Sequence, residues 1–200
     1  MQHLHQRNIV LGSTSVYRRE LLARLRLPFS VVPSHFDESP LAGESPAALA
    51  ARLALGKAHE VAKLHPQSVV IGCDQVADLH GTALGKPGNF ERAMQQLQAM
   101  RGQTVLFQTA VAVVCLENGF CEQVLVPVAV KFRSLSDLEI TNYLLLEEPY
   151  DCAGSAKSEG LGIALLESIE SDDPTTLIGL PLIRTSAMLR AAGISLLGTP

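Results

Sequence analysis

Short apolar runs alternate along the chain with longer segments in which apolar residues recur every three or four positions. The short runs predict β-strands, and the periodic segments predict α-helices. Glycine, proline and asparagine lie between them, as is typical of turns. The pattern predicts strands at 9–11, 29–32, 68–72, 82–84, 104–116, 123–132 and 161–169, and helices at 46–64, 90–100, 136–147 and 182–192, with one more helix that contains Leu21, Leu22 and Leu25.

Local signals support these elements and indicate the fold class. Ser45 followed by Pro46 is a typical helix start, and Ser136 with Glu139 forms a capping box. The pair Asn118-Gly119 predicts a tight hairpin between two of the strands. Strands that alternate with helices and include one antiparallel hairpin predict an α/β fold with a mixed sheet.

Composition narrows the possible classes of protein. The chain has 200 residues, of which 47% are hydrophobic and only 4% aromatic, so we expect one domain over 1–200, or two small lobes, with an aliphatic core. The net charge of −4 argues against a nucleic acid polymer as partner. No window approaches the roughly 18 apolar residues that span a bilayer, so no membrane partner is expected.

The ends of the chain and the cysteines predict a cytoplasmic protein. Residues 1–7 are polar and lack the apolar core of a secretory signal, which predicts a flexible tail and a cytoplasmic location. The four cysteines contain no Cys-x-x-Cys pair, so we expect free thiols in a reducing compartment. They are Cys73, Cys115, Cys121 and Cys152.

The first helix combines features of an anion site. Thr14 or Ser15 is expected to cap it, and Ser13 adds a third hydroxyl group in front of it. Arg18 and Arg19 fall in the first turn, where the helix dipole already favours negative charge, so two cations there are locally unfavourable. They are explained if an anion binds at this helix terminus. The alternative is an arginine pair that extends into solvent.

Two residues on apolar elements are candidates for catalysis. Asp74 follows the apolar strand 68–72, and α/β proteins bind ligands beyond the carboxyl ends of strands, so Asp74 could hold a metal ion or act as a base. The alternative is an aspartate in a turn. Lys57 lies on one helical stripe with Leu49, Leu53 and Val61. A lysine there is more often one that extends its ammonium to the edge of the apolar surface, and the alternative is a cation directed at a phosphate.

Three further charged residues lie in predicted loops, and each is a weak signal by itself. Lys86 lies between Gly85 and Pro87, Glu38 lies in an acidic loop, and Glu159 follows a run of small residues. A carboxylate such as Glu159 accepts hydrogen bonds only and could receive two N–H donors from a guanine ring. The alternative for each is a solvated surface charge. The chain lacks the phosphate-binding loop, the dinucleotide fingerprint and the nucleophile elbow, which disfavours P-loop kinases, dehydrogenases and α/β-hydrolases.

Taken together, these segments resemble the Maf family of nucleoside triphosphate pyrophosphatases. The resemblance extends from about residue 9 to about residue 197 and is closest to the subgroup assigned to 7-methyl-GTP. Two departures are Val16, where the family usually has proline, and Tyr17, where the subgroup usually has tryptophan. The matching segments are LGSTSVYRRELL (11–22), RLALGKA (52–58), IGCDQV (71–76), LGKP (84–87), CAGSAKSEG (152–160) and GLPL (179–182).

The resemblance implies an elongated mixed sheet with flanking helices and two lobes around a nucleotide-binding cleft, similar to inosine triphosphatase. It implies hydrolysis of 7-methyl-GTP to 7-methyl-GMP and diphosphate with Mg²⁺ or Mn²⁺, in a protein that could form a homodimer. Catalytic roles fall on Asp74, Lys57 and Lys86, and metal binding on Glu38 and Asp74. Substrate binding falls on Ser13, Tyr17, Arg18, Gln75 and Glu159.

Two alternatives are kept beside this interpretation. One is a dTTP or UTP pyrophosphatase of the same fold, against which the combination of Tyr17, Gln75 and Glu159 argues. The other is a nucleotide-binding regulator of septum formation that does not hydrolyse its ligand. The presence of the full set favours an enzyme over this second alternative; the set is Asp74, Lys57, Lys86 and Glu38.

Overall fold

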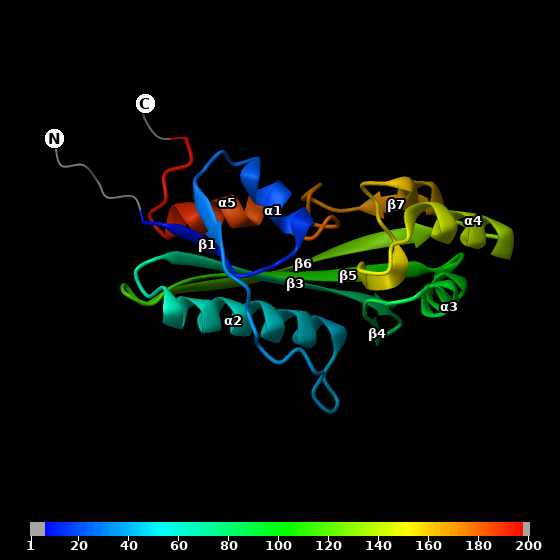
Figure 1. Ribbon diagram of the computed structural model, residues 1–200, viewed down its shortest axis with the longest axis horizontal. Helices are drawn as coiled ribbons and strands as arrows, with labels where there is room; N and C mark the ends of the chain where they lie inside the picture. The colour runs from blue at the N-terminus through cyan, green and yellow to red at the C-terminus, as the bar shows by residue number, and fades with distance from the viewer. Residues whose placement is uncertain (1–6, 198–200) are drawn as a thin grey trace.

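The computed structural model describes residues 7–197, which form a seven-stranded mixed sheet with helices on its faces (Figure 1). The spatial order of the strands is β2-β1-β3-β5-β6-β7, and β4 pairs with the end of β3. β1 pairs in parallel with β2 and β3, and the other pairs are antiparallel. The strands are β1 (Ile9–Leu11), β2 (Phe29–Val31), β3 (Val69–Leu79), β4 (Thr82–Leu84), β5 (Thr104–Cys115), β6 (Phe120–Phe132) and β7 (Leu166–Glu170).

The described residues contain five α-helices, and their starts follow the local signals. Ser15 caps α1, Ser45 caps α2 with Pro46 at its first position, and Ser136 forms the capping box of α4 with Glu139. The helices are α1 (Val16–Ala23), α2 (Pro46–Leu64), α3 (Phe90–Met100), α4 (Asp137–Glu147) and α5 (Leu182–Ala191), and short 3₁₀ helices span Ala153–Ser155 and Leu161–Leu165.

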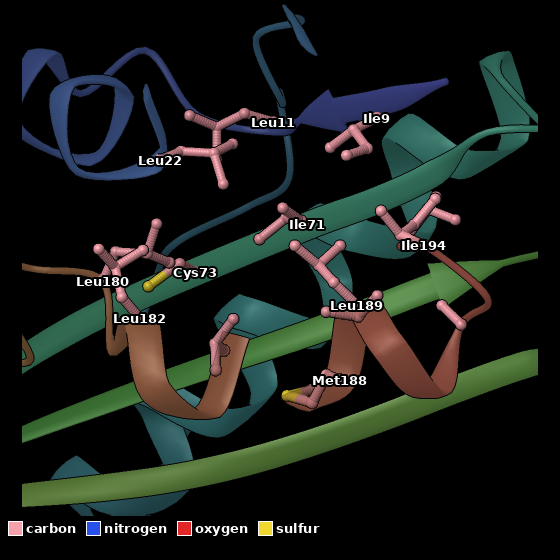
Figure 2. Packing of buried hydrophobic residues seen from close by; sticks show 14 of the residues in the cluster. Ile9, Leu11, Leu22, Ile71, Cys73, Leu180, Leu182, Met188, Leu189 and Ile194 are labelled. Atoms are coloured by element: carbon pink, nitrogen blue, oxygen red, sulfur yellow. The ribbon is translucent and has the colours of Figure 1, made fainter. Parts of the chain in front are cut away.

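Side chains of β3 alternate between the two faces of the sheet, and each face is covered by different helices. Ile71 and Cys73 pack with α1 and α5 in a cluster that includes Leu22 and Leu189 (Figure 2). The intervening residues face α2, which lies along the opposite face in Figure 1. A second core, built around Leu97, Met100, Phe107, Phe132 and Leu144, lies where α3 and α4 pack near the far half of the β5–β6 hairpin.

Gly72 allows α2 to approach β3 unusually closely. A Cβ at position 72 would lie 2.6 Å from the backbone nitrogen of Ala58, a distance that requires the helix to move. The absence of a side chain at Gly72 therefore sets the spacing between helix and strand. This spacing decides how far a side chain on α2 must extend to reach β3.

The mixed α/β sheet and the Asn118-Gly119 hairpin are confirmed, while three predicted strand boundaries are wrong. β3 continues through Asp74 to Leu79, because β5 supplies a ladder partner for each residue from Val70 to Asp78. β6 begins at Phe120 rather than 123, and the segment 161–165 is 3₁₀ helix, so that β7 starts at Leu166. The apolar run 68–72 suggests that Asp74 lies at the carboxyl end of a strand. In the structure Asp74 instead lies inside β3.

Some expectations about the ends of the chain fall outside the described residues. Residues 1–6 of the predicted flexible tail lie outside the described residues. The last residue of that predicted tail, Arg7, is described, and its guanidinium lies 2.6 Å from the Glu117 carboxylate. All four cysteines are free, with Cys73 and Cys115 buried. Among the described residues, no helix has both the length and the apolar character needed to cross a membrane.

Candidate active site

A cleft of about 980 Å³ opens at a notch in the edge of β3. β1 pairs with β3 only as far as Ile71, and β4 pairs with it only from Ala77 onward. Among the described strands, residues 72–76 therefore have ladder partners on the β5 side alone. The nine residues to which the sequence assigns a catalytic, substrate-binding or metal-binding role all line this cleft, namely Ser13, Tyr17, Arg18, Glu38, Lys57, Asp74, Gln75, Lys86 and Glu159.

The Lys57 ammonium lies between two carboxylates on one wall of the cleft. Its Nζ lies 2.6 Å from Asp74 Oδ1 and 2.6 Å from Glu38 Oε1. Lys57 is only 7% exposed and lines the cleft, so its ammonium is directed into the cleft and not to the edge of the apolar surface. The four-residue spacing directs it at the sheet together with Leu49 and Leu53, and alternation along β3 places Asp74 on the same face. This geometry fixes a cation and two anions at one point.

Positive charge around the cleft keeps Glu38 ionised. Burial raises the pKa of the Glu38 carboxyl, but the hydrogen bond from Lys57 and the charges of Lys57 and Lys86 outweigh it. The pKa therefore lies below its ordinary value, and the charge of Arg18 contributes to the same shift. Lys86 itself is exposed on the loop after β4, where Gln96 Nε2 donates to Gly85 O at 3.0 Å.

The loop that carries Glu38 is fastened to the outer side of α2. Arg52 and Glu60 lie on this side, eight residues apart, and hold the two ends of the loop. Arg52 Nε donates to Glu44 Oε1 at 2.7 Å, and Arg52 Nη2 donates to Glu44 Oε2 at 2.8 Å. Glu60 accepts a hydrogen bond from the Ser34 hydroxyl near the start of the loop. The loop is thus held on both sides of Glu38.

Gly56 lies midway between Arg52 and Glu60, and the ring of Phe36 packs against it. A Cβ at position 56 would lie 2.6 Å from Phe36 Cε2, so Gly56→Ala requires the ring to move. Because Glu38 is two residues further along, we expect its carboxylate to shift and kcat/KM to fall about tenfold or more, as misplaced groups commonly cause. Steady-state kinetics measure this. In a Phe36→Ala background the clash is absent, and Gly56→Ala should then have no further effect; an equal loss in both backgrounds would contradict the explanation.

The start of α1 presents an arginine and two hydroxyl groups to the cleft. Ser15 Oγ accepts the Arg18 backbone N–H at 3.4 Å, and Ser13 Oγ accepts the Ser15 N–H at 3.2 Å. The Arg18 guanidinium donates to Ser13 Oγ at 3.4 Å and to Gly179 O at 3.0 Å. Arg19 is exposed and does not line the cleft. The arginine pair is therefore divided, and only Arg18 extends toward the expected anion.

A buried aspartate that the sequence did not single out holds the segment opposite Arg18. Asp173 is 2% exposed, and its carboxylate accepts the Ile183 N–H at 2.7 Å and the Thr175 N–H at 3.0 Å. These bonds tie the turn 173–179 to the start of α5. The turn ends at Gly179, whose φ of +126° suits glycine, and whose carbonyl accepts from Arg18.

The cleft is also lined by the aromatic ring of Tyr17 and the carboxylate of Glu159. Burial, together with nearby negative groups, raises the pKa of Tyr17 to about 12, and burial raises the pKa of Glu159 above its ordinary value. Gln75 Nε2 donates to Thr109 Oγ1 at 2.8 Å and to Thr176 O at 3.1 Å. The amide nitrogen of Gln75 is therefore committed to the protein, which leaves its oxygen for a ligand.

Lys157 is a cleft residue to which the sequence reasoning gave no role. Its Nζ lies 5.6 Å from the centroid of the Tyr17 ring and 2.9 Å from Glu147 Oε1. The sequence signal for Lys157 was its position two residues before Glu159 in a loop of small residues.

Two other groups that shape the cleft had little or no sequence signal. Asp173 was visible only as part of an Asp-Pro turn, and the backbone carbonyl of Gly179 had no signal at all.

The arrangement suits an anionic ligand with a polar ring at one end. Arg18, Lys57 and Lys86 supply positive charge around Glu38, whereas Tyr17 and Glu159 lie around Lys157. Among residues 7–197 no group of three or more His, Cys, Asp or Glu side chains could hold a metal ion by itself. A cation would therefore need further oxygen ligands from a bound molecule.

Comparison with known proteins gives a family match over most of the chain. The family model for Maf, described as Maf-like protein, matches residues 8–192. A 7-methyl-GTP pyrophosphatase of Polaromonas sp. strain JS666 is 67% identical over 190 residues, which cover 95% of this chain and 87% of the relative. Another 7-methyl-GTP pyrophosphatase, from Albidiferax ferrireducens, is 65% identical over 193 residues, which cover 96% of this chain and 97% of the relative.

Similarity to solved structures is weaker. A nucleoside-triphosphatase (dITP/XTP pyrophosphatase) from Mycobacterium abscessus is 18% identical, with a TM-score of 0.44. The similarity covers 96% of this chain and all of that chain.

Proposed function

Because the chain belongs to the Maf family, we propose that it is a 7-methyl-GTP pyrophosphatase, which releases 7-methyl-GMP and diphosphate. The observation that carries the proposal is the Lys57 ammonium shared by Asp74 and Glu38 in a cleft that also holds Arg18 and Lys86. This set combines a candidate base with positive charges for the phosphates. The relative that is 67% identical is named 7-methyl-GTP pyrophosphatase.

The proposed reaction is hydrolysis at the α-phosphorus. The oxygen of a water molecule bonds to this phosphorus while the bond to the oxygen that bridges to the β-phosphorus breaks. Asp74 accepts the proton of the attacking water, and the diphosphate leaves with the electron pair of the broken bond. Lys57 holds the Asp74 carboxylate in place through its 2.6 Å ion pair.

The cations of the cleft stabilise the charge that develops on the departing diphosphate. Phosphoryl transfer depends on positioning and electrostatic stabilisation more than on covalent chemistry by the protein. Arg18 is well placed for this role, because its Nε bond to Gly179 O fixes the guanidinium at the start of α1. The N–H groups of that helix terminus add positive potential.

Mg²⁺ or Mn²⁺ is proposed as the cofactor, with Glu38 and Asp74 as its protein ligands. Mg²⁺ takes oxygen ligands and is commonly bound by one or two carboxylates plus substrate phosphates. The two carboxylates fit this donor set, since both already converge on one cationic group, the Lys57 ammonium. A bound divalent cation would neutralise part of the charge of the phosphates.

Specificity for the base is assigned to Tyr17, Glu159 and Gln75. The 7-methylguanine ring is cationic, and an aromatic face attracts a cation by about 0.5–2 kcal/mol. Glu159 can accept from the ring N1–H and the exocyclic amine, and a donor left without a partner once the bound base excludes water costs about 1–3 kcal/mol. Tyr17 and Glu159 together therefore favour the methylated guanine over a pyrimidine.

Release of diphosphate by the purified protein tests the proposal. We expect hydrolysis of 7-methyl-GTP with Mg²⁺ or Mn²⁺, complete loss of activity with a chelator, and slower hydrolysis of GTP, ITP, UTP, dTTP and the other common nucleotides. Preference for UTP or dTTP would overturn the base specificity but retain the chemistry. Tight binding of nucleotides without hydrolysis would favour the regulator. Light scattering tests the homodimer that the resemblance implies, and cell fractionation the cytoplasmic location.

A further inference from the structure

Lys157 is held rigidly in the cleft beside the ring of Tyr17. Its Nζ lies 2.9 Å from Glu147 Oε1 on α4, and its backbone N–H donates to the Tyr143 hydroxyl at 3.1 Å. Gly162 packs directly on its backbone, because a Cβ at position 162 would lie 2.6 Å from Lys157 N. Glu147 also accepts the Leu161 N–H at 2.7 Å, so the loop is fastened to α4 at Lys157 and again at Leu161. The ammonium therefore has little freedom of position.

The ammonium of Lys157 has hydrogen-bonding capacity that its contacts do not use. A lysine carries three N–H donors and no acceptor, of which the Glu147 carboxylate takes one and the Tyr17 hydroxyl can take a second. The ammonium also lies 5.6 Å from the centre of the Tyr17 ring, where a cation is attracted to the aromatic face. Lys157 lines the cleft, and its side chain is 27% exposed. At least one N–H is thus available to a ligand.

The two charged side chains of this loop complement one edge of a guanine ring. Along that edge guanine presents an oxygen acceptor at C6, then an N–H at N1 and an amine at C2. Lys157 can only donate and ionised Glu159 can only accept, so the pair matches this order. Adenine presents an amine at C6, which would face the ammonium donor to donor. Uracil presents an oxygen in place of the amine, which would face the carboxylate acceptor to acceptor.

We propose that Lys157 is a specificity residue that donates a hydrogen bond to the 6-oxo oxygen of the purine, while Glu159 accepts from N1–H and the 2-amine. The inference rests on the proposed function and names the feature of the base that each charge recognises. Glu147 positions the ammonium. The two carboxylates of Glu147 and Glu159 and the one ammonium of Lys157 give a net negative charge, so the part of the cleft around Lys157 remains suited to a cationic ring.

The test compares inhibitors that differ at one atom. GTP and 6-thio-GTP share N1–H and the 2-amine, and differ in having oxygen or the weaker acceptor sulfur at C6. Their inhibition constants are measured against 7-methyl-GTP hydrolysis by the wild type and by Lys157→Met. We expect the wild type to bind GTP on the order of tenfold more tightly than 6-thio-GTP, as a hydrogen bond from a charged donor predicts. In Lys157→Met the ratio should approach one.

Two comparisons separate recognition from a purely structural ion pair. The ratio of GTP to ITP, which reports on the 2-amine, should be the same in the wild type and in Lys157→Met. Lys157→Arg keeps a charged donor and should retain most of the oxygen preference even where Lys157→Met folds poorly. Lys131→Met removes a lysine that donates to Gly102 O outside the cleft, and should change neither ratio.

The results distinguish failure of the inference from failure of the proposed function. Equal loss of affinity for GTP and 6-thio-GTP in Lys157→Met, with the ratio unchanged, would overturn the role of Lys157 and leave the enzyme as proposed. Absence of 7-methyl-GTP hydrolysis by the wild type would refute the proposed function itself, and with it the inference.

Discussion

Replacing Asp74 with asparagine is expected to lower kcat by about 10²–10⁴-fold, the usual contribution of a positioned base. Asparagine keeps the shape of the side chain but cannot accept the proton of the attacking water. The folded structure should persist, because β3 keeps its ladder to β5 and Lys57 keeps its ion pair with Glu38. Diphosphate release under saturating 7-methyl-GTP measures kcat, and the thermal midpoint reports on folding.

Asp78 provides a matched control for Asp74. It lies four residues further along β3, on the same face of the strand, and does not line the cleft. Its carboxylate accepts from Gly81 N–H at 2.7 Å and from Gln108 Nε2 at 3.2 Å. The asparagine oxygen can keep the first contact, and its amide nitrogen can donate to the Gln108 oxygen once that side-chain amide turns over. Asp78→Asn should therefore leave kcat near the wild-type value. An Asp74→Asn variant with wild-type turnover would remove Asp74 as the proton acceptor.

Lys57→Met is expected to reduce both activity and stability. Without the ammonium, the buried Asp74 carboxylate loses its partner and lies near the negative charge of Glu38. Breaking a buried ion pair by removing one member costs up to about 3–5 kcal/mol of unfolding free energy. The displaced base and the lost positive charge should lower kcat/KM by about 10²–10³-fold. Denaturant unfolding and steady-state kinetics measure the two effects.

A double variant separates the two effects of Lys57. Lys57→Met with Asp74→Asn contains no unpaired charge at position 74, so it should recover much of the stability that Lys57→Met loses, while it remains inactive. Lys63→Met, on the exposed face of the last turn of α2, should leave both quantities unchanged. If Lys57→Met were as stable as the wild type, the ion pair would contribute nothing to folding.

The helix starts could be predicted because their signals are local. Ser45 with Pro46 and Ser136 with Glu139 determine where α2 and α4 begin through contacts within four residues. The strand ends could not be predicted in this way. β3 extends through Asp74 and Gln75 because β5, more than thirty residues away in sequence, supplies its hydrogen-bond partners. A polar residue in such a strand looks like a strand end when only its neighbours in sequence are considered.

The candidate site shows the same division between local and long-range information. Residue types and their order in the motifs were enough to select nine side chains that line one cleft. The partners of Lys57 were not visible, because they depend on how closely α2 approaches β3 at Gly72. The roles of Asp173 and of the Gly179 carbonyl were also hidden, since a backbone oxygen has no sequence signal.

The sequence by itself determined the order of helices and strands, the family, and the charged residues available for chemistry, because these depend on residue type and short-range periodicity. Only the tertiary structure decided that Arg18 faces the cleft while Arg19 is exposed, and that Lys57 is paired with Asp74 and Glu38 rather than solvated. The physical reason is that ion pairing and burial depend on distances between elements far apart in the chain. Those distances are set by packing of the whole sheet and its helices.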